Sequence, residues 1–266
     1  MGSVSNPVAS TVSAAASVNS VSLPATNSVS DYFPSIINNA LVWLKEDGIT
    51  GTSAVTEWTN SGTGGADYDL DVVVGTGANL KPHPSGSCLL YGASGDFVTT
   101  PSSATLQLAN SVDIQIGCAP DDWTPSTTMT LLSKRSGLSG EYWCFINTDG
   151  TLRLRWYNSV PSLVTVNSTA SVSFSDGELG FVRFVRNTTD DEVIFYTSSD
   201  GEIWTQLGNT VAIASYTGLT TSNDVEIGAS DNGANERFLG SIHRVRIYDG
   251  AGTLAADFNP VEAGNT

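Results

Sequence analysis

The chain has 266 residues, 40% of them apolar, and it carries 27 acidic against 11 basic side chains, which gives a net charge of −16. This excess of acid excludes nonspecific nucleic-acid binding, which depends on lysine and arginine neutralising phosphates. No apolar run approaches the roughly 20 residues that a spanning helix needs, so we expect no membrane insertion. A charged fraction of 14% and 26 glycines favour a β protein with many turns.

The first segment differs from the rest because residues 1–30 contain no charged side chain. Serine, valine and alanine dominate it, without the basic start or continuous apolar stretch of a secretory signal. One interpretation is a disordered leader. The interpretation that we favour is an extended N-terminal arm, residues 1–37, that pairs with a partner's sheet edge in an assembly. Residues 38–266 then form the folded domain.

Beyond residue 40 the sequence alternates between apolar and polar residues with a period of two, as β-strands do. In the segment 111–118, Val112, Ile114 and Ile116 face one way. The segment 152–156 alternates in the same manner and is joined to residues 141–147 through a hairpin signal, Thr148-Asp149-Gly150. Further strands are predicted at 181–186, 193–197 and 242–248.

Turn signals separate these segments at Asp47-Gly48, Asp176-Gly177, Asp200-Gly201, Asn232-Gly233 and Asp249-Gly250. Only the stretch around Ser35–Ala40 is a candidate helix. Many short strands without helical crossovers predict an all-β fold, an antiparallel jelly-roll β-sandwich. We expect it to be a single domain.

The three cysteines, Cys88, Cys118 and Cys144, each lie in an apolar, strand-like run. A free thiol in such a place behaves as a small buried hydrophobe. The odd count and the missing signal predict free thiols and synthesis in a reducing cytoplasm.

Several motifs follow one another along most of the chain: Ala40–Leu44, Val55–Gly62, Leu89–Gly92 with Gly95–Val98, Leu131–Lys134, Val193–Gly208 and Val225–Tyr248. In order and spacing they resemble the concanavalin A-like lectin/glucanase superfamily, and within it the laminin G-like domains. The resemblance covers about residues 40–259 and implies a jelly-roll β-sandwich of the concanavalin A type. This fold serves adhesion, glycan binding, hydrolysis and structural roles, and it recurs in phage virion surface proteins.

The acidic residues and histidines form no recognised catalytic pattern. Retaining glycosidases need two carboxylates about 5–5.5 Å apart, and no Glu-x-Asp-x-x-Glu strand is present. Asp67, Asp69 and Asp71 alternate, which we interpret as a solvated acidic edge, with weak calcium binding as the alternative. His83 lies between two prolines, and His243 lies in a strand, where we expect a surface position. We therefore expect no enzyme.

Glycan sites combine aromatic faces that stack on sugar rings with polar groups that bind hydroxyls. Trp123, which follows Asp122 in a polar loop, is a candidate exposed stacking residue, with burial in a core or interface as the alternative. Arg153, Arg155 and Tyr157 alternate with apolar residues on one strand and complete the candidate ligand-binding set. Three further tryptophans are interpreted mainly as core: Trp58, Trp143 and Trp204.

The arginines gather in the second half of the chain, at positions 153, 155, 183, 186, 237, 244 and 246. One interpretation is a cationic sheet face for a sulfated or carboxylated glycan. The alternative, which we favour, is cross-strand pairing with Asp191, Glu192 and Glu226. The laminin G resemblance also implies one calcium ion at the rim of the sandwich, for which Asp224, Asp231 and Asn232 match best.

The sequence thus predicts a non-enzymatic structural or adhesive protein with a lectin-like domain. We place it on the surface of a virion, as a phage capsid decoration, fibre or tail component. Residues 1–37 would bind other virion proteins, and the domain would bind cell-surface or environmental glycans as a homo-oligomer or part of a larger assembly. A secreted, extracellular bacterial lectin or adhesin is the alternative, and a polysaccharide-degrading enzyme is the third.

Overall fold

The computed structural model describes residues 42–50, 57–60, 70–73, 79–83, 86–91, 96–159, 162–216 and 218–259, and before Tyr91 it describes the backbone alone. These residues form strands, turns and loops, and none of them is helical. The described part of the chain accordingly holds no helix of the length and apolarity that a membrane crossing requires. The arm, residues 1–37, and the candidate helix at 35–40 lie outside the described residues.

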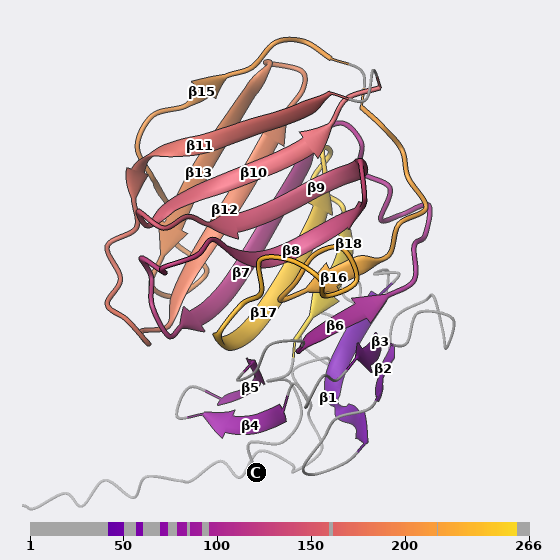
Figure 1. Cartoon of the computed structure of the whole chain (residues 1–266), viewed down its shortest axis with the longest axis vertical. Coiled ribbons are helices and arrows are strands. Elements are labelled where there is room, and N and C mark those ends of the chain that lie inside the picture. Colours follow the sequence, from indigo (N-terminus) through magenta and orange to yellow (C-terminus); the bar gives the residue numbers. More distant parts are fainter. Residues whose placement is uncertain are drawn as a thin grey trace, which may run out of the picture.

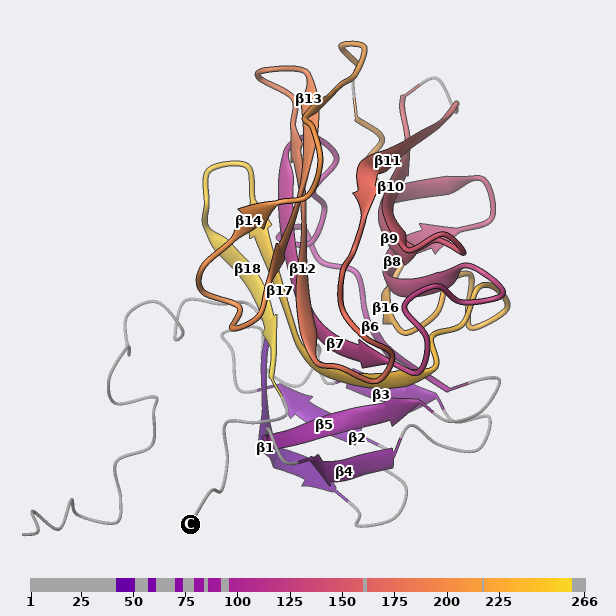
Figure 2. The ribbon, with the colours of Figure 1, turned by 90° about the vertical axis from the view of Figure 1, so that its left-hand side faces the viewer.

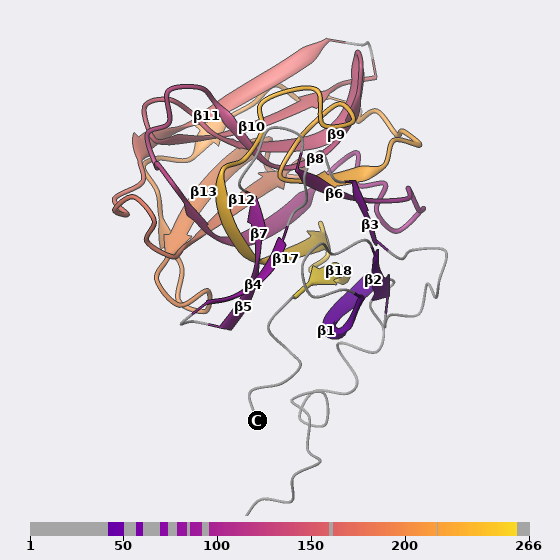
Figure 3. The same cartoon turned by 60° about the horizontal axis from the view of Figure 1, so that its bottom comes forward.

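The strands form two layers packed face to face (Figures 1 and 2). The back layer runs, in order of pairing, through β13 (Glu192–Ser198), β12 (Gly180–Asn187), β7 (Val112–Pro120), β17 (Gly240–Asp249) and β18 (Leu254–Phe258). The short strands β14 (Thr205–Gln206) and β15 (Val211–Ala212) extend it beyond β13. Strand β5 (Gly86–Tyr91), itself paired with β4 (Asn79–His83), lies along the first residues of β17 (Figure 3).

The front layer runs through β11 (Leu163–Ser171), β10 (Thr151–Tyr157), β9 (Ser139–Ile146), β8 (Met129–Ser136), β16 (Val225–Ile227), β6 (Phe97–Thr100), β3 (Leu70–Val73), β2 (Glu57–Asn60) and β1 (Val42–Thr50). Strand β1 joins the layers because it also pairs with β18, in the parallel direction. The other pairings are antiparallel, so the predicted antiparallel β-sandwich is confirmed.

The main core lies between the layers and is built by the predicted alternation. On β7 the side chains of Val112, Ile114 and Ile116 are at most 1% exposed, and on β10 those of Leu152 and Leu154 are fully buried. Full burial of such a side chain contributes about 1.5–3 kcal/mol. The alternation of apolar and polar residues therefore both fixes the strands and supplies their stability.

Two of the predicted free thiols lie in this core. Cys118 and Cys144 are fully buried and unpaired by any disulfide, as expected, and burial raises the pKa of each thiol well above its ordinary value. A raised pKa keeps a thiol protonated and unreactive at neutral pH. The side chain of Cys88 lies outside the described residues.

One expected turn is not a turn. Asp47-Gly48 lies inside β1, at the place where the register between β1 and β2 shifts between Leu44 and Ile49. A strand irregularity and a turn attract the same residue types, because both need a local departure from extended backbone. The hairpin at Gly150 and the turn at Gly201 do form, each with its glycine at a positive φ, 75° and 76°.

A buried ion pair joins two neighbouring strands of the front layer, β8 and β9. The side chains of Lys134 on β8 and Glu141 on β9 are fully buried, with Nζ and Oε1 3.1 Å apart. Lys134 also donates to the carbonyl oxygens of Thr221 and Asn223, at 3.0 and 2.7 Å. Desolvation lowers the pKa of Lys134, and the neighbouring Glu141 carboxylate opposes that shift. The pair fastens the loop before β16 to the sheet.

Candidate ligand-binding pocket

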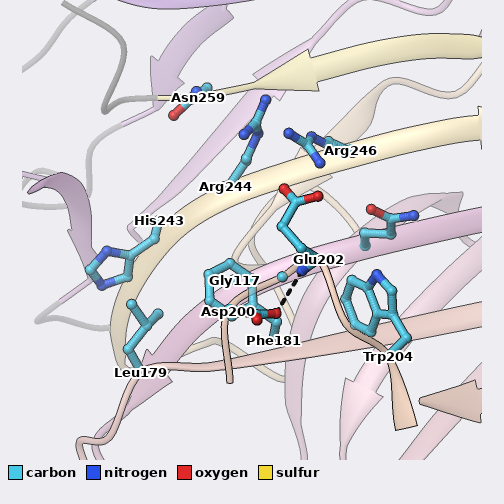
Figure 4. A pocket seen from close by; sticks show the side chains of 12 residues that line it. Gly117, Leu179, Phe181, Asp200, Glu202, Trp204, His243, Arg244, Arg246 and Asn259 are labelled. Carbon is cyan, nitrogen blue, oxygen red and sulfur yellow. Dashed lines mark hydrogen bonds between the residues drawn. The ribbon is translucent and has the colours of Figure 1, made fainter. Parts of the chain in front are cut away.

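A pocket of about 200 Å³ opens on the outer face of the back layer. Its floor comes from β7, β12 and β17, and its wall comes from the loop between β13 and β14 (Figure 4). Figure 4 shows Phe181, Glu202 and Trp204 on one side, with Arg244 and Arg246 along β17 on the other. The pocket is therefore bounded by aromatic rings and by charged groups.

The register of three strands explains which side chains meet there. Opposite Gln115 of β7 lie Arg183 of β12 and Arg246 of β17, and opposite Gly117 lie Phe181 and Arg244. Residues two apart on a strand share a face, so both rows point outward, away from the core. The hollow follows from this arrangement, because Gly117 contributes no side chain to the middle of its row.

The ring of Phe181 packs closely against two glycines, Gly117 and Gly201. A Cβ atom at Gly117 would lie 2.6 Å from Cε1 of that ring, and a Cβ at Gly201 would lie 2.8 Å from Cδ1. Both distances are closer than carbon atoms pack, so any larger residue would displace the ring. Phe181 is thereby held between the sheet and the wall of the pocket.

The wall is a tight turn organised by one carboxylate. Oδ1 of Asp200 accepts hydrogen bonds from the Ser198 hydroxyl and from the backbone N–H groups of Glu202 and Ile203, at 2.8, 2.8 and 2.9 Å. The N–H groups of Ile203 and Glu202, followed by the Ser198 hydroxyl, hold the pKa of Asp200 below its ordinary value. The turn leaves Trp204 half-buried at the pocket and Glu202 exposed at its rim.

The structure therefore corrects the sequence interpretation of Trp204 as a core residue. The signal that could have located it is the run Ser198-x-Asp200-Gly201, a turn whose carboxylate caps its own backbone, followed closely by a tryptophan. Phe181, Gly117, Arg244 and Arg246 carried no comparable signal, since strand register alone brings them together.

The arginines around the pocket are held by carboxylates. Arg244 donates to both oxygens of Asp257, at 2.9 and 2.6 Å, and Nε of Arg246 lies 3.7 Å from the same group. Arg183 donates to both oxygens of Asp113, at 2.8 and 2.7 Å, and this bonding raises its pKa. Cross-strand pairing is thus present, but its partners are not the predicted Asp191, Glu192 and Glu226.

The arginines also do not share one face. Arg183, Arg244 and Arg246 lie on the outer face of the back layer, while Arg153 and Arg155 lie on the outer face of the front layer. Arg186 is fully buried and donates to backbone carbonyl oxygens. The interpretation of a single cationic sheet face is therefore wrong.

Trp123 is not an exposed stacking residue. It is 2% exposed, its Nε1 donates to the carbonyl oxygen of Glu178 at 3.2 Å, and its ring lies 5.0 Å from that of Phe174. Asp122 accepts hydrogen bonds from the backbone N–H and hydroxyl of Thr124, at 2.7 and 3.1 Å. Asp122 shapes the loop, and the packing of Phe174 covers the tryptophan.

Arg153, Arg155 and Tyr157 do share a face, opposite the main core. Tyr157 is 6% exposed and packs in a second apolar cluster with Trp143 and Phe145. The guanidinium carbon of Arg155 lies 5.5 Å from the Trp143 ring centre, and that of Arg153 lies 5.8 Å from the Phe145 ring centre. These three residues lie together on the layer opposite the pocket, and their role in ligand binding stays a prediction.

The three residues matched to calcium do not converge. Asp224 precedes β16 and accepts a hydrogen bond from the N–H of Ser102, at 3.2 Å. Asp231, beyond β16, accepts one from the N–H of Gly137 at 2.9 Å and lies 3.8 Å from Arg135. Asn232 takes part in that turn through its N–H, and the described residues contain no group of three or more histidine, cysteine or acidic side chains suited to a metal. As placed, these residues do not fit one ion, and calcium binding stays a prediction.

His243 occupies a different place from the one expected. It is 3% exposed rather than on the surface, and its Nε2 lies 3.0 Å from the hydroxyl of Ser241. The register between β7 and β17 shifts between Ile242 and Arg244, which makes His243 the extra residue of a β-bulge, and its side chain lines the pocket.

No protein-family model matches the chain, and no curated protein matches it. Solved structures do match in fold. The binding domain of botulinum neurotoxin serotype G has a TM-score of 0.53 at 11% identity, over 72% of this chain and 45% of that one. The binding domain of botulinum neurotoxin DC gives 0.53 at 13% identity in its complex with rat synaptotagmin II, and 0.54 at 14% in its complex with SialylT. In both of these the match covers 80% of this chain and 48% of that one. The chain thus spans about half the length of these structures, which share its β-sandwich fold.

Proposed function

We propose that this chain is a non-enzymatic, carbohydrate-binding domain of a larger assembly. The observation that carries the proposal is the pocket, where the rings of Phe181 and Trp204 face the polar side chains of Gln115 and Arg246. Sugar rings present apolar faces edged by hydroxyls, so they need this mixture of aromatic surface and hydrogen-bonding groups. The solved structures of similar fold are named binding domains, which also supports binding.

The carboxylates of the pocket favour binding over hydrolysis. Asp200 is committed to its turn and has a lowered pKa, which makes it a poor proton donor at neutral pH. Asp257 is bound by Arg244 through both oxygens. Of the carboxylates that the described residues place at the pocket, this leaves Glu202, whereas a glycosidase needs an acid and a second carboxylate.

The finer proposal is that the assembly is a virion, with this domain displayed on its surface as a capsid decoration, fibre or tail component of a phage. The laminin G resemblance, the uncharged segment 1–30 and the acidic composition of the rest support it. Residues 1–37 would bind neighbouring virion proteins or copies of the same chain. Under this proposal the pocket faces outward and contacts host or environmental glycans.

Replacement of Trp204 by alanine tests the binding proposal. We expect wild-type protein to bind members of a glycan array and Trp204→Ala to bind them at least tenfold more weakly, because the stacking surface is lost. The matched control is Ile203→Ala, which removes a 76% exposed neighbour that does not line the pocket. The same array read with and without chelator tests calcium. Equal binding by both variants, or no bound glycan, would contradict the proposal.

A further inference from the structure

The charges around the pocket decide which sugars it can accept. The guanidinium groups of Arg244 and Arg246 line the pocket, that of Arg183 lies beside Trp204, and each lies near a carboxylate of the sheet. Arg183 and Arg244 make two hydrogen bonds each, with distances from 2.6 to 2.9 Å, to Asp113 and Asp257. Arg246 lies 3.7 Å from Asp257 as well. The positive charge is therefore largely neutralised before any ligand arrives.

Further negative charge lies at the mouth of the pocket. The carboxylates of Asp200 and Glu202 belong to exposed residues of the wall, and Figure 4 shows Glu202 pointing across the pocket toward β17. The lining thus holds two carboxylates and two guanidinium groups, and Asp257, which pairs with both of these arginines, adds a third carboxylate. The pKa of Asp200 is lowered, so this carboxylate is ionised at neutral pH. The local balance is negative, as it is for the whole chain.

An acidic sugar would meet two obstacles in such a site. Its carboxylate or sulfate would approach Glu202 at the rim of the pocket, and like charges at short range repel. To form an ion pair with Arg244, the acidic sugar would also have to displace Asp257, which accepts two hydrogen bonds from that guanidinium group. Such bidentate pairs are among the stronger charged contacts in proteins. Neither obstacle applies to a ligand without charge.

Hydroxyl groups suit the same site. Gln115 offers an amide donor and an amide acceptor, Glu202 offers acceptors, and Arg246 offers donors. A hydroxyl both donates and accepts, so a ring with several hydroxyls can satisfy all three while its apolar face lies on Trp204. We propose that the pocket takes a neutral pyranoside and discriminates against sialylated and sulfated glycans. This inference rests on the proposed function.

The test is a glycan array on which neutral oligosaccharides stand beside their sialylated and sulfated counterparts, probed with the full chain. We expect neutral members to bind about tenfold or more tightly than their acidic counterparts. Glu202→Gln keeps the shape of the side chain and removes its charge, so the ratio between neutral and acidic binding should narrow. Asp190→Asn makes the same charge change at an exposed turn at the other end of β12, and it should leave the ratio unchanged.

The outcomes separate the two proposals. If acidic glycans bind as well as or better than neutral ones and Trp204→Ala abolishes that binding, the pocket is a glycan site and the neutral preference is wrong. If the ratio fails to narrow in Glu202→Gln, the stated cause of the preference is wrong. If no glycan binds, or Trp204→Ala has no effect, both the proposed function and this inference are overturned.

Discussion

Asp200 controls the position of Trp204, because three donors of the turn converge on its Oδ1. We expect Asp200→Ala to weaken glycan binding about tenfold by loosening the wall of the pocket. Asp149→Ala is the matched control, since Oδ1 of Asp149 accepts from the N–H and hydroxyl of Thr151 in a hairpin of the other layer. Both variants should melt at lower temperature, measured by circular dichroism. Equal loss of binding in both would contradict a positioning role.

The lowered pKa of Asp200 gives this role a pH signature. The ionised carboxylate accepts these hydrogen bonds more strongly than the protonated acid does. Its contribution to stability is therefore fully present above the ordinary pKa of 3.8 and is lost as pH falls through the lower, folded-state pKa. Binding should therefore not depend on the titration of Asp200 between pH 5 and pH 8, the window in which histidine ordinarily titrates.

Two tryptophans show what local sequence can and cannot predict at this scale. Trp204 follows the predicted turn at Asp200-Gly201, and Trp123 lies in a predicted polar loop, between Asp122 and Thr124, whose N–H donates to the Asp122 carboxylate. Their exposure was not predicted correctly, because it depends on residues distant in the chain: Phe174 packs against Trp123, whereas Trp204 faces a hollow beside Gly117. Turn chemistry is local, and burial is not.

Among the elements, the pairing of β8 with β9 contains the charge pair of Lys134 and Glu141. Glu141→Gln should lower the free energy of unfolding by about 3–5 kcal/mol, because it leaves the buried ammonium without its counter-charge. The double variant Lys134→Met/Glu141→Leu should recover most of that loss, since no buried charge remains. Urea unfolding curves measure both. A loss below about 1 kcal/mol in Glu141→Gln would contradict this account.

The elements themselves were largely predictable, and their register was not. Alternation located β7, β10, β12 and β17 to within a few residues, because a half-buried strand must repeat every second residue. Nothing in that alternation says that Gly117 stands opposite Arg244, with a shift at His243. The core was therefore foreseeable from periodicity, whereas the pocket, which is a product of register, was not.

At the scale of the whole molecule, residues 1–30 carry no charge whereas the rest of the chain does. This division predicts that assembly depends on the first segment and that folding of the sandwich does not. Deletion of residues 1–30 removes no charge, so we expect the sandwich to keep its melting temperature and the assembly to dissociate. Light scattering after gel filtration measures the mass of each species. A chain with Gly-Ser residues in place of 1–30 controls for length. A truncated protein that assembles normally would show that the arm is dispensable.

The position of β17 in the middle of the back layer has a consequence for biosynthesis. Arg244 pairs with Gly117, which is 127 residues earlier in the chain, and the same strand also pairs with β5 and β18. Such long-range contacts form late, because their loop-closure entropy must first be overcome. During synthesis, the aromatic residues of the pocket, Phe181 and Trp204, are therefore made before Arg244 and Arg246 of β17. Under the proposed function, a chain that has not yet inserted β17 between β7 and β18 would lack Arg244 and Arg246 at the pocket and would not bind its ligand.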